Sequence, residues 1–242
     1  MLLTLILNWL AYLFMVLVNA LANIIPIGGK TTGEISARLE VLFTPAGYVF
    51  SIWGLIYMLL GIWLVRQISK RRRKLPLYRE TSPLFILSCL LNVTWIFLWH
   101  YQLFIWTVLV MISLLIMLIL LYRKVKDNQP AKIDQAPFSI YLGWISVATI
   151  ANISYVLVEY NWDGIGLSPI TWTIIMLIVA TLLAIHFRIN ENDRLFSLVF
   201  VWAIIGIGVQ NQVSYPSLSK FAYMLAAIIF IVTLLPIKQK GK

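Results

Sequence analysis

Eight long apolar runs, separated by short polar segments, are the feature that most constrains how this 242-residue chain can fold. An apolar run near 20 residues spans the hydrocarbon core of a bilayer as an α-helix, whose backbone groups satisfy one another. Only 12% of the residues are charged, against about 25% in soluble domains. We therefore predict an all-α, polytopic membrane protein with about eight transmembrane helices. The predicted spans are residues 2–25, 47–67, 83–100, 103–122, 137–159, 169–187, 194–212 and 219–237.

The basic residues alternate between the connections of this topology. All but three of the 19 lysines and arginines fall in every second connection or in the C-terminal tail, and the exceptions are Lys30, Arg38 and Lys220. Cytoplasmic loops carry such an excess, so we predict that both termini are cytoplasmic, in a bacterial-type cell membrane. The net charge of +10 then reflects contact with anionic lipid and gives no nucleic-acid site. The lipid bilayer is the expected partner, and a homodimer is left open.

Two local features bear on processing and redox chemistry. No lysine or arginine precedes the first run, and the run is longer than the apolar part of a signal peptide, so we expect it to be retained as a helix. Cys89 is the one cysteine and lies within an apolar run, which predicts a buried, inert thiol and excludes a cysteine metal cluster. In the polar segment 26–46, Thr31 and Glu34 fit a capping box that begins a short helical turn.

Asparagines recur at regular intervals from the third predicted span onward. Asn92, Asn152 and Asn211 are spaced by 60 and 59 residues, and Trp144 and Trp202 by 58. We infer a two-helix unit repeated three times, because many membrane folds are built from such repeats, with sites at the repeat interface.

Helical spacing gathers aromatic and amide side chains on single faces. Trp53, Tyr57 and Gly61 recur four residues apart, and Asn92 lies three residues before Trp95. Such amides face the protein interior, since lipid offers no hydrogen bonds. There they either bond helix to helix or line a ligand cavity. We expect Trp106, Trp162 and Trp172 in an aromatic belt at the outer interface.

Signals for catalysis are scarce. The two histidines, His100 and His186, fall on opposite sides of the membrane in this topology, and no acid lies deep within a span. The sequence has no glycine-rich phosphate loop, metal-ligand spacing or serine nucleophile motif. Ion-driven transporters place an ionisable residue at membrane depth, so the pattern favours binding or facilitated passage over pumping.

Three motifs together resemble the TspO/translocator family, the tryptophan-rich sensory proteins. The first contains Pro45, Phe50, Trp53, Tyr57 and Gly61, the second is Leu91-Asn92-x-x-Trp95, and the third is Tyr141-Leu142-x-Trp144 with Asn152 after it. The family's Pro-Pro is Pro45-Ala46 here, and the segment before Trp53 is one residue shorter. Residues 1–161 resemble the family's five-helix bundle with its long first loop, 26–46, and residues 162–242 add three helices and a basic tail.

The resemblance implies a pocket for an apolar aromatic ligand, porphyrin-like or sterol-like, with the loop 26–46 as its lid. It implies a binding or sensory protein that requires no cofactor, although a bound tetrapyrrole or lipid is expected to accompany it. A small-molecule transporter or facilitator built from the repeated hairpins is the main alternative. Two further alternatives are light-dependent degradation of porphyrin and a role as a membrane assembly factor. The residues expected to line the pocket are Pro45, Phe50, Trp53, Tyr57, Asn92, Trp95, Trp144, Ala148 and Asn152.

Overall fold

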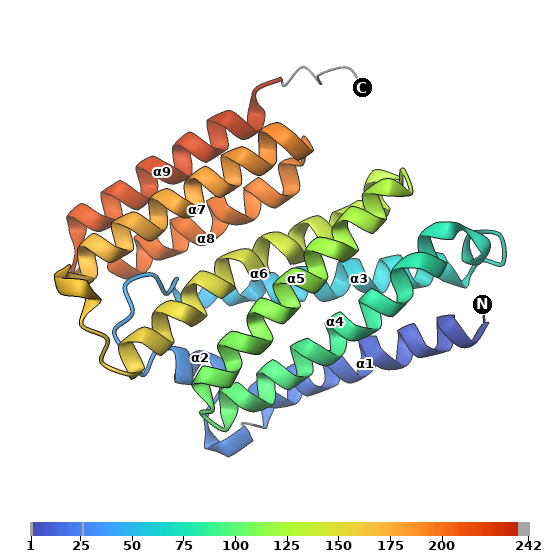
Figure 1. Ribbon diagram of the computed structural model, residues 1–242, viewed down its shortest axis with the longest axis horizontal. Coiled ribbons are helices and arrows are strands. Elements are labelled where there is room, and N and C mark those ends of the chain that lie inside the picture. The colour runs from blue at the N-terminus through green and yellow to red at the C-terminus, as the bar shows by residue number, and fades with distance from the viewer. Residues whose placement is uncertain (1, 26, 237–242) are drawn as a thin grey trace. The chain divides into compact units, whose positions relative to one another are not determined.

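All regular secondary structure in the described residues, 2–25 and 27–236, is helical in the computed structural model (Figure 1). Each predicted span corresponds to one helix that is long and apolar enough to cross a membrane, so the all-α, eight-helix prediction is confirmed. The long helices are α1 (Leu2–Ile24), α3 (Ile52–Ile68), α4 (Pro76–His100), α5 (Phe104–Asp127), α6 (Lys132–Glu159), α7 (Pro169–Glu191), α8 (Arg194–Asn211) and α9 (Pro216–Leu234). Shorter elements are η1 (Ile27–Gly29), α2 (Thr32–Ser36), η2 (Gly47–Ser51), η3 (Arg72–Lys74) and η4 (Gly164–Gly166).

Several helices begin earlier than their apolar runs. α4 begins at Pro76 and continues through Pro83, and α6 begins at Lys132 and continues through Pro137. Hydropathy detects only the apolar part of a helix, whereas charged residues can form its first turns outside the hydrocarbon. Ile237, the predicted end of the last span, and the basic tail after it lie outside the described residues, as does Pro26 at the start of the loop.

The chain divides into two compact units, each of which is built from two separate segments of the sequence. Unit 1 comprises Met1–Arg38 and Ser51–Ile145, and unit 2 comprises Leu39–Phe50 and Ser146–Lys242. The first loop is therefore split between the units, and so is α6. The division predicted at residue 161 concerns likeness to a family and stays a prediction.

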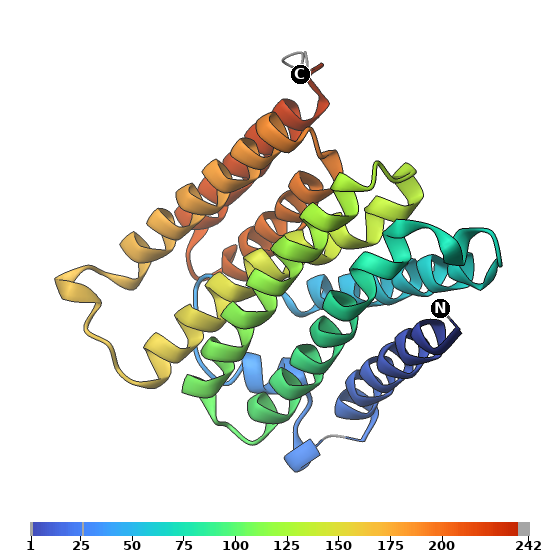
Figure 2. The same ribbon diagram turned by 45° about the vertical axis from the view of Figure 1, so that its right-hand side comes forward.

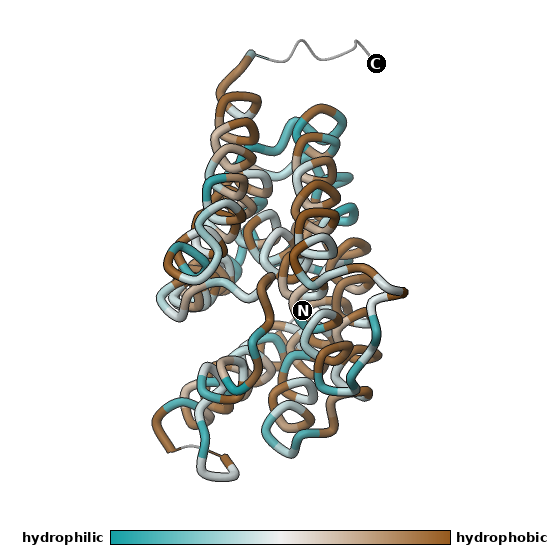
Figure 3. The backbone as a smooth tube through the Cα atoms, turned by 90° about the vertical axis from the view of Figure 1, so that its left-hand side faces the viewer, coloured by the Kyte–Doolittle hydropathy of each residue, from teal (hydrophilic) through white to brown (hydrophobic). Residues whose placement is uncertain are grey.

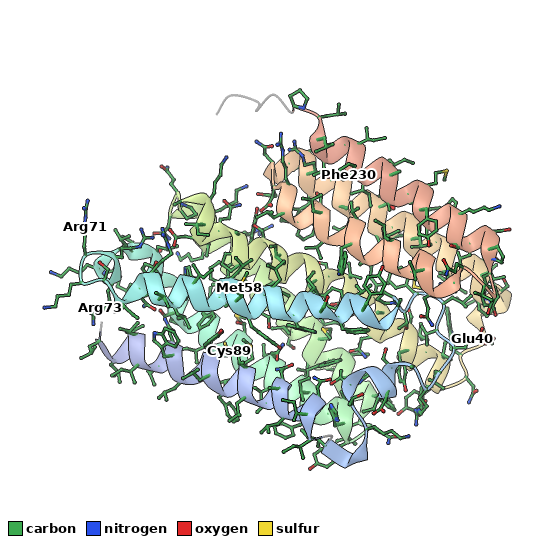
Figure 4. The ribbon with its side chains drawn as sticks, turned by 180° about the vertical axis from the view of Figure 1, so that it is seen from behind. Glu40, Met58, Arg71, Arg73, Cys89 and Phe230 are labelled. Atoms are coloured by element: carbon green, nitrogen blue, oxygen red, sulfur yellow. The ribbon has the colours of Figure 1, made fainter. Side chains whose placement is uncertain are left out.

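Unit 1 is organised around α4. This helix packs against both α5 and α1, and α1 also packs against α3. The start of α1 and the connection between α3 and α4 lie at the same end of unit 1 (Figures 1 and 2), and Arg71 and Arg73 project from that connection (Figure 4). A buried aromatic cluster joins α3, α4 and α6 within unit 1. The Trp63 ring contacts the rings of Tyr78, Phe85 and Phe138 at 5.1–5.2 Å between centroids.

An ion-pair cluster lies at the charged end of unit 1. The side chain of Asp134, on the first turn of α6, is only 2% exposed and accepts hydrogen bonds from Arg66 Nε at 2.8 Å and Arg72 at 2.6 Å. The hydroxyl of Tyr78 donates to the same carboxylate at 3.4 Å. This one acid thus joins α3, η3, α4 and α6. Sequence analysis missed it, because Asp134 precedes the apolar run to which its helix belongs.

Unit 2 is built on three mutually packed helices, α7, α8 and α9, which lie side by side in Figure 1. Phe187 of α7 stacks on Phe196 of α8 with ring centroids 3.7 Å apart. The buried guanidinium of Arg188 donates to the carbonyl oxygens of Thr233 at 3.1 Å and Leu235 at 2.8 Å. It thereby satisfies carbonyls at the C-terminal end of α9 that have no partner within the helix.

The surface of the helices is strongly apolar. On α1 the buried residues form one stripe, while large aliphatic side chains such as Leu3, Leu10 and Leu17 are more than half exposed. Figure 3 shows hydrophobic, brown stretches along the helical parts of both units. Such surfaces are stable only against hydrocarbon or another apolar surface. The chain is an integral membrane protein, and these side chains meet lipid.

Candidate ligand-binding site

The best candidate site begins on the aromatic face of α3. Trp53 stacks on Tyr57, four residues later, with ring centroids 5.5 Å apart and planes inclined by 21°. Edge contacts then join the Trp53 ring to two residues of α6, Tyr141 at 5.8 Å and Trp144 at 6.3 Å. Offset-stacked and edge-to-face arrangements are those that aromatic quadrupoles favour. The spacing of Trp53 and Tyr57 thus produces the shared face that it predicts.

Gly61 completes this face by allowing α1 to approach. A Cβ at Gly61 would lie 2.9 Å from the hydroxyl oxygen of Tyr12, and that hydroxyl donates a hydrogen bond of 2.8 Å to the carbonyl of Tyr57. Small residues are used in this way wherever membrane helices pack closely. The contact fixes α1 against the helix that carries the aromatic face.

A buried polar chain borders the aromatic cluster. Asn19 of α1 donates to the amide oxygen of Asn92 on α4 at 2.7 Å, and Asn92 donates to the hydroxyl of Tyr141 on α6 at 3.2 Å. All three side chains are at most 7% exposed. Because Tyr141 also contacts Trp53, one residue connects the polar chain to the aromatic face. Asn92 thus makes hydrogen bonds between helices and also lies next to the candidate site.

The hydroxyl of Tyr57 is a distinctive polar atom of this face. It is shielded from solvent and makes no hydrogen bond with any described residue. A buried donor left in this state costs about 1–3 kcal/mol. A polar atom of a bound molecule could remove that cost, so the Tyr57 hydroxyl marks where such an atom would be oriented.

The other predicted site residues are Trp95, Pro45, Phe50, Ala148 and Asn152. Trp95 is half-buried and stacks on Trp99, with centroids 5.2 Å apart, towards the end of α4. Four belong to unit 2: Pro45 and Asn152 are buried, whereas Phe50 and Ala148 are half-buried. Pro45 packs beside α8, where a Cβ on Gly206 would lie 3.2 Å from the Pro45 Cβ. That these four join the aromatic face in one pocket stays a prediction.

The first loop is anchored in two different ways. In unit 1 the ring of His100 bonds to the Thr32 hydroxyl at 3.0 Å and to the carbonyl of Ile27 at 2.9 Å. The predicted capping box of Thr31 and Glu34 is confirmed. Hydrogen bonds from the backbone amide and hydroxyl of Thr31 lower the pKa of Glu34. The role of the loop 26–46 as a lid stays a prediction.

Residues 39–50, the end of the first loop and the turn after it, belong to unit 2 and lie against α8. Asn211 donates to the carbonyl of Leu42 at 2.9 Å, and the Trp202 indole donates to the carbonyl of Val49 at 3.1 Å. Asn211 therefore bonds to loop backbone, whereas Asn92 bonds to two side chains. The partners of these two repeat positions differ, and the predicted repetition of the helix pairs themselves stays a prediction.

Two expectations about reactive groups can be compared with the structure. Cys89 is 1% exposed, so the prediction that this thiol is buried is confirmed. Among the described residues, no three His, Cys, Asp or Glu side chains gather closely enough to hold a metal ion. The side chains of the aromatic face and its polar neighbours are phenols, indoles and amides, whose chemistry is stacking and hydrogen bonding.

Sequence reasoning missed Asn19 and Tyr12 as neighbours of this face. A signal was present, since Asn8 and Asn19 are 11 residues apart on α1 and so share a helical face. Asn8 bonds to Gln67 at 3.1 Å and to Ser82 at 2.8 Å, so both asparagines join α1 to the rest of unit 1.

Comparison with known proteins agrees with the motifs. A family model described as TSPO-like protein matches residues 5–235, which includes the three C-terminal helices as well as the first five. No curated protein and no solved structure matches the chain significantly. The match and the eight apolar helices indicate an integral membrane protein of the ligand-binding or transport class. The chain belongs to the TSPO-like protein family.

Proposed function

We propose that this protein binds an apolar, ring-shaped molecule, with a porphyrin as the leading candidate and a sterol as the second, at the aromatic face of α3. The observation that carries the proposal is the shielded Tyr57 hydroxyl, which has no hydrogen-bond partner among the described residues, within a cluster of aromatic rings. Flat apolar rings bind aromatic side chains by dispersion and stacking. A few convergent polar groups then fix their orientation.

Each part of the cluster has a role in this proposal. Trp53 and Trp144 supply stacking surface from two helices, and the Tyr57 hydroxyl donates to a polar edge such as a propionate. The chain from Asn19 through Asn92 to Tyr141 holds α1, α4 and α6 in register. Trp95 of α4 adds to the proposed lining within unit 1, and the parts of Pro45, Phe50, Ala148, Asn152 and the loop 26–46 stay predictions from the sequence.

The test is an equilibrium titration of purified protein with protoporphyrin IX, followed by the change in porphyrin absorbance. An absorbance readout stays valid when tryptophans are replaced. Tyr57→Phe keeps the ring and removes the hydroxyl, so affinity should fall by about tenfold, the effect of one hydrogen bond to a charged group. Trp53→Leu should weaken binding further, because it removes the ring that links α3 to α6.

Matched controls use exposed residues of the same types. Tyr101 is 65% exposed and Trp106 is 59% exposed, so Tyr101→Phe and Trp106→Leu should leave the affinity unchanged. Displacement of bound porphyrin by cholesterol would show that sterols also bind at this site. Absence of saturable binding, or equal affinity in wild type, Tyr57→Phe and Trp53→Leu, would contradict the proposal.

Passage of the ligand through the protein is the second candidate function. Polar side chains pair at three places in unit 1: Asn8 with Ser82 and Asn19 with Asn92, which are buried, and half-buried Thr32 with His100. A facilitator would present such groups in succession to a moving solute. Flux of porphyrin into proteoliposomes, lost in Asn92→Leu, would favour this function, whereas saturable binding without flux would favour a sensor.

A further inference from the structure

Unit 2 contains a cavity of about 140 Å³ where α6 ends and α7 begins. Three of its walls are the loop residues 40–43, the last turns of α6, and the connection that contains η4. All of these segments belong to unit 2, so the cavity is separate from the aromatic face of α3. A cavity of about 150 Å³ is large enough to bind benzene.

The walls of this cavity are held in place by hydrogen bonds. The indole of Trp172 donates to the carbonyl of Gly164 at 2.7 Å, and Gly164 has a φ of +68°, which glycine adopts without strain. Asn211 fixes the loop wall through the carbonyl of Leu42. The site therefore exists before any ligand arrives, which lowers the entropic cost of binding.

The aromatic part of the wall consists of two tryptophans. The rings of Trp162 and Trp172 lie 5.1 Å apart between centroids, and both line the cavity. Their positions in the sequence are typical of an interfacial belt, and the structure adds this second role. Indole faces attract cations, and quaternary ammonium groups are recognised in this way.

Two carboxylates give the same cavity a negative charge. Glu40 and Asp163 line it, and none of the described residues around it is basic. The Tyr215 hydroxyl holds Glu40 at 2.9 Å, at the end of unit 2 where α8 passes to α9 (Figure 4). The backbone amide of Ile165 holds Asp163 at 3.0 Å. Each carboxylate thus has one oxygen fixed by a hydrogen bond at this cavity.

We infer that this cavity is a binding site for a small organic cation of the quaternary-ammonium type, about the size of choline. Aromatic faces, two carboxylates and a benzene-sized volume together fit a compact, poorly hydrated positive charge. An anion would meet two like charges, and a neutral molecule would gain from the indoles but leave the carboxylates unused. The ammonium group could belong to free choline or to a phosphocholine lipid headgroup.

The test compares choline with 3,3-dimethylbutan-1-ol, its neutral isostere, by calorimetric titration of the full-length protein in maltoside detergent. We expect choline to bind saturably and the isostere at least about tenfold more weakly, because the isostere contacts the indoles without a positive charge for their faces and the carboxylates to attract. Equal binding of the two, or no saturable choline binding, would overturn the inference.

The variants preserve the local hydrogen bonds. In Asp163→Asn and Glu40→Gln the amide oxygen can still accept from Ile165 and Tyr215, respectively, so each variant should fold. Each should weaken choline binding about three- to tenfold and leave the affinity for the isostere unchanged. Trp162→Leu should have a similar effect. Asp127→Asn and Trp106→Leu, at exposed positions of α5, are the matched controls. Unchanged choline affinity in the Glu40→Gln, Asp163→Asn double variant would overturn the inference.

Nanodiscs separate the two sources of the ammonium group. A lower apparent choline affinity in phosphatidylcholine than in phosphatidylglycerol discs supports occupation by the headgroup, and equal affinity supports the free cation. No saturable binding in either disc contradicts both. Porphyrin titration of Asp163→Asn, whose residue has no part in the proposed porphyrin site, should match wild type, so this inference and the proposed function can fail independently.

Discussion

The backbone amide of Ala46 donates a hydrogen bond to the carbonyl oxygen of Gly206 on α8, at 3.1 Å. The two residues are far apart in sequence, yet their backbones meet because Gly206 has no side chain. A Cβ at this position would collide with a methyl group of Val49 and lie 3.2 Å from the Cβ of Pro45. The second half of the first loop is thus fastened to α8 at a glycine.

Gly206→Ala should therefore destabilise unit 2. The added methyl group forces Val49 and the loop backbone away from α8, and we expect a loss of about 1–3 kcal/mol in reversible unfolding from detergent mixtures. Gly54→Ala is the matched control, because a Cβ at Gly54 meets nothing within 4 Å. Equal stability of the two variants would show that the loop does not depend on this contact.

The contrast between the helices and this loop shows what could be predicted. The eight spans follow from runs of apolar residues, because bilayer thickness sets the length of a helix without reference to its neighbours. The path of residues 39–50 depends on Gly206, Trp202 and Asn211, which occur more than 150 residues later. No local pattern in the loop indicates those partners, so the loop was predicted only as a lid over the first five helices.

Replacing Asp134 should destabilise unit 1 more than replacing any other acid of that unit. Removing its carboxylate in Asp134→Ala leaves Arg66, Arg72 and the hydroxyl of Tyr78 without their shared acceptor. The arginine side chains are 29% and 31% exposed, so water reduces the penalty to about 2–3 kcal/mol of unfolding free energy. Asp127→Ala, at an exposed position, is the control, and an equal effect would refute the prediction.

The hydrogen bond between Asn19 and Asn92 can be measured with a double-mutant cycle. Each alanine substitution removes one partner and leaves the other buried, so each should cost about 1–2 kcal/mol. The double variant should cost less than the sum by about 0.6 kcal/mol, the average for hydrogen bonds between membrane helices, and by about 1.7 kcal/mol at most. Ser113→Ala on exposed α5 should combine additively with Asn92→Ala, and a zero coupling between the two asparagines would exclude their interaction.

The candidate site was only partly predictable for a similar reason. Trp53 and Tyr57 stack because four residues make about one helical turn, and sequence spacing is enough to show it. Which residues of α1 and α6 face that stack depends on how three helices pack, which spacing within one helix does not encode. Tyr12, Asn19 and Tyr141 therefore entered the site only when the fold brought them there.

The capping box at the start of α2 gives a prediction about acidity. Hydrogen bonds from the backbone amide and hydroxyl of Thr31 lower the pKa of Glu34 below its ordinary value of 4.5. The ionised carboxylate thus stabilises the folded loop at pH values above 4.5, and this contribution is lost as the pH falls below 4.5 and through the lower folded-state pKa. Hydrogen exchange at the amide of Thr31, which donates to Glu34 at 2.7 Å, should show reduced protection in that window after correction for intrinsic rates. Glu34→Gln keeps an acceptor that does not titrate there, so its protection should stay constant with pH. A wild-type profile as flat as that of Glu34→Gln would rule out this role for the carboxylate.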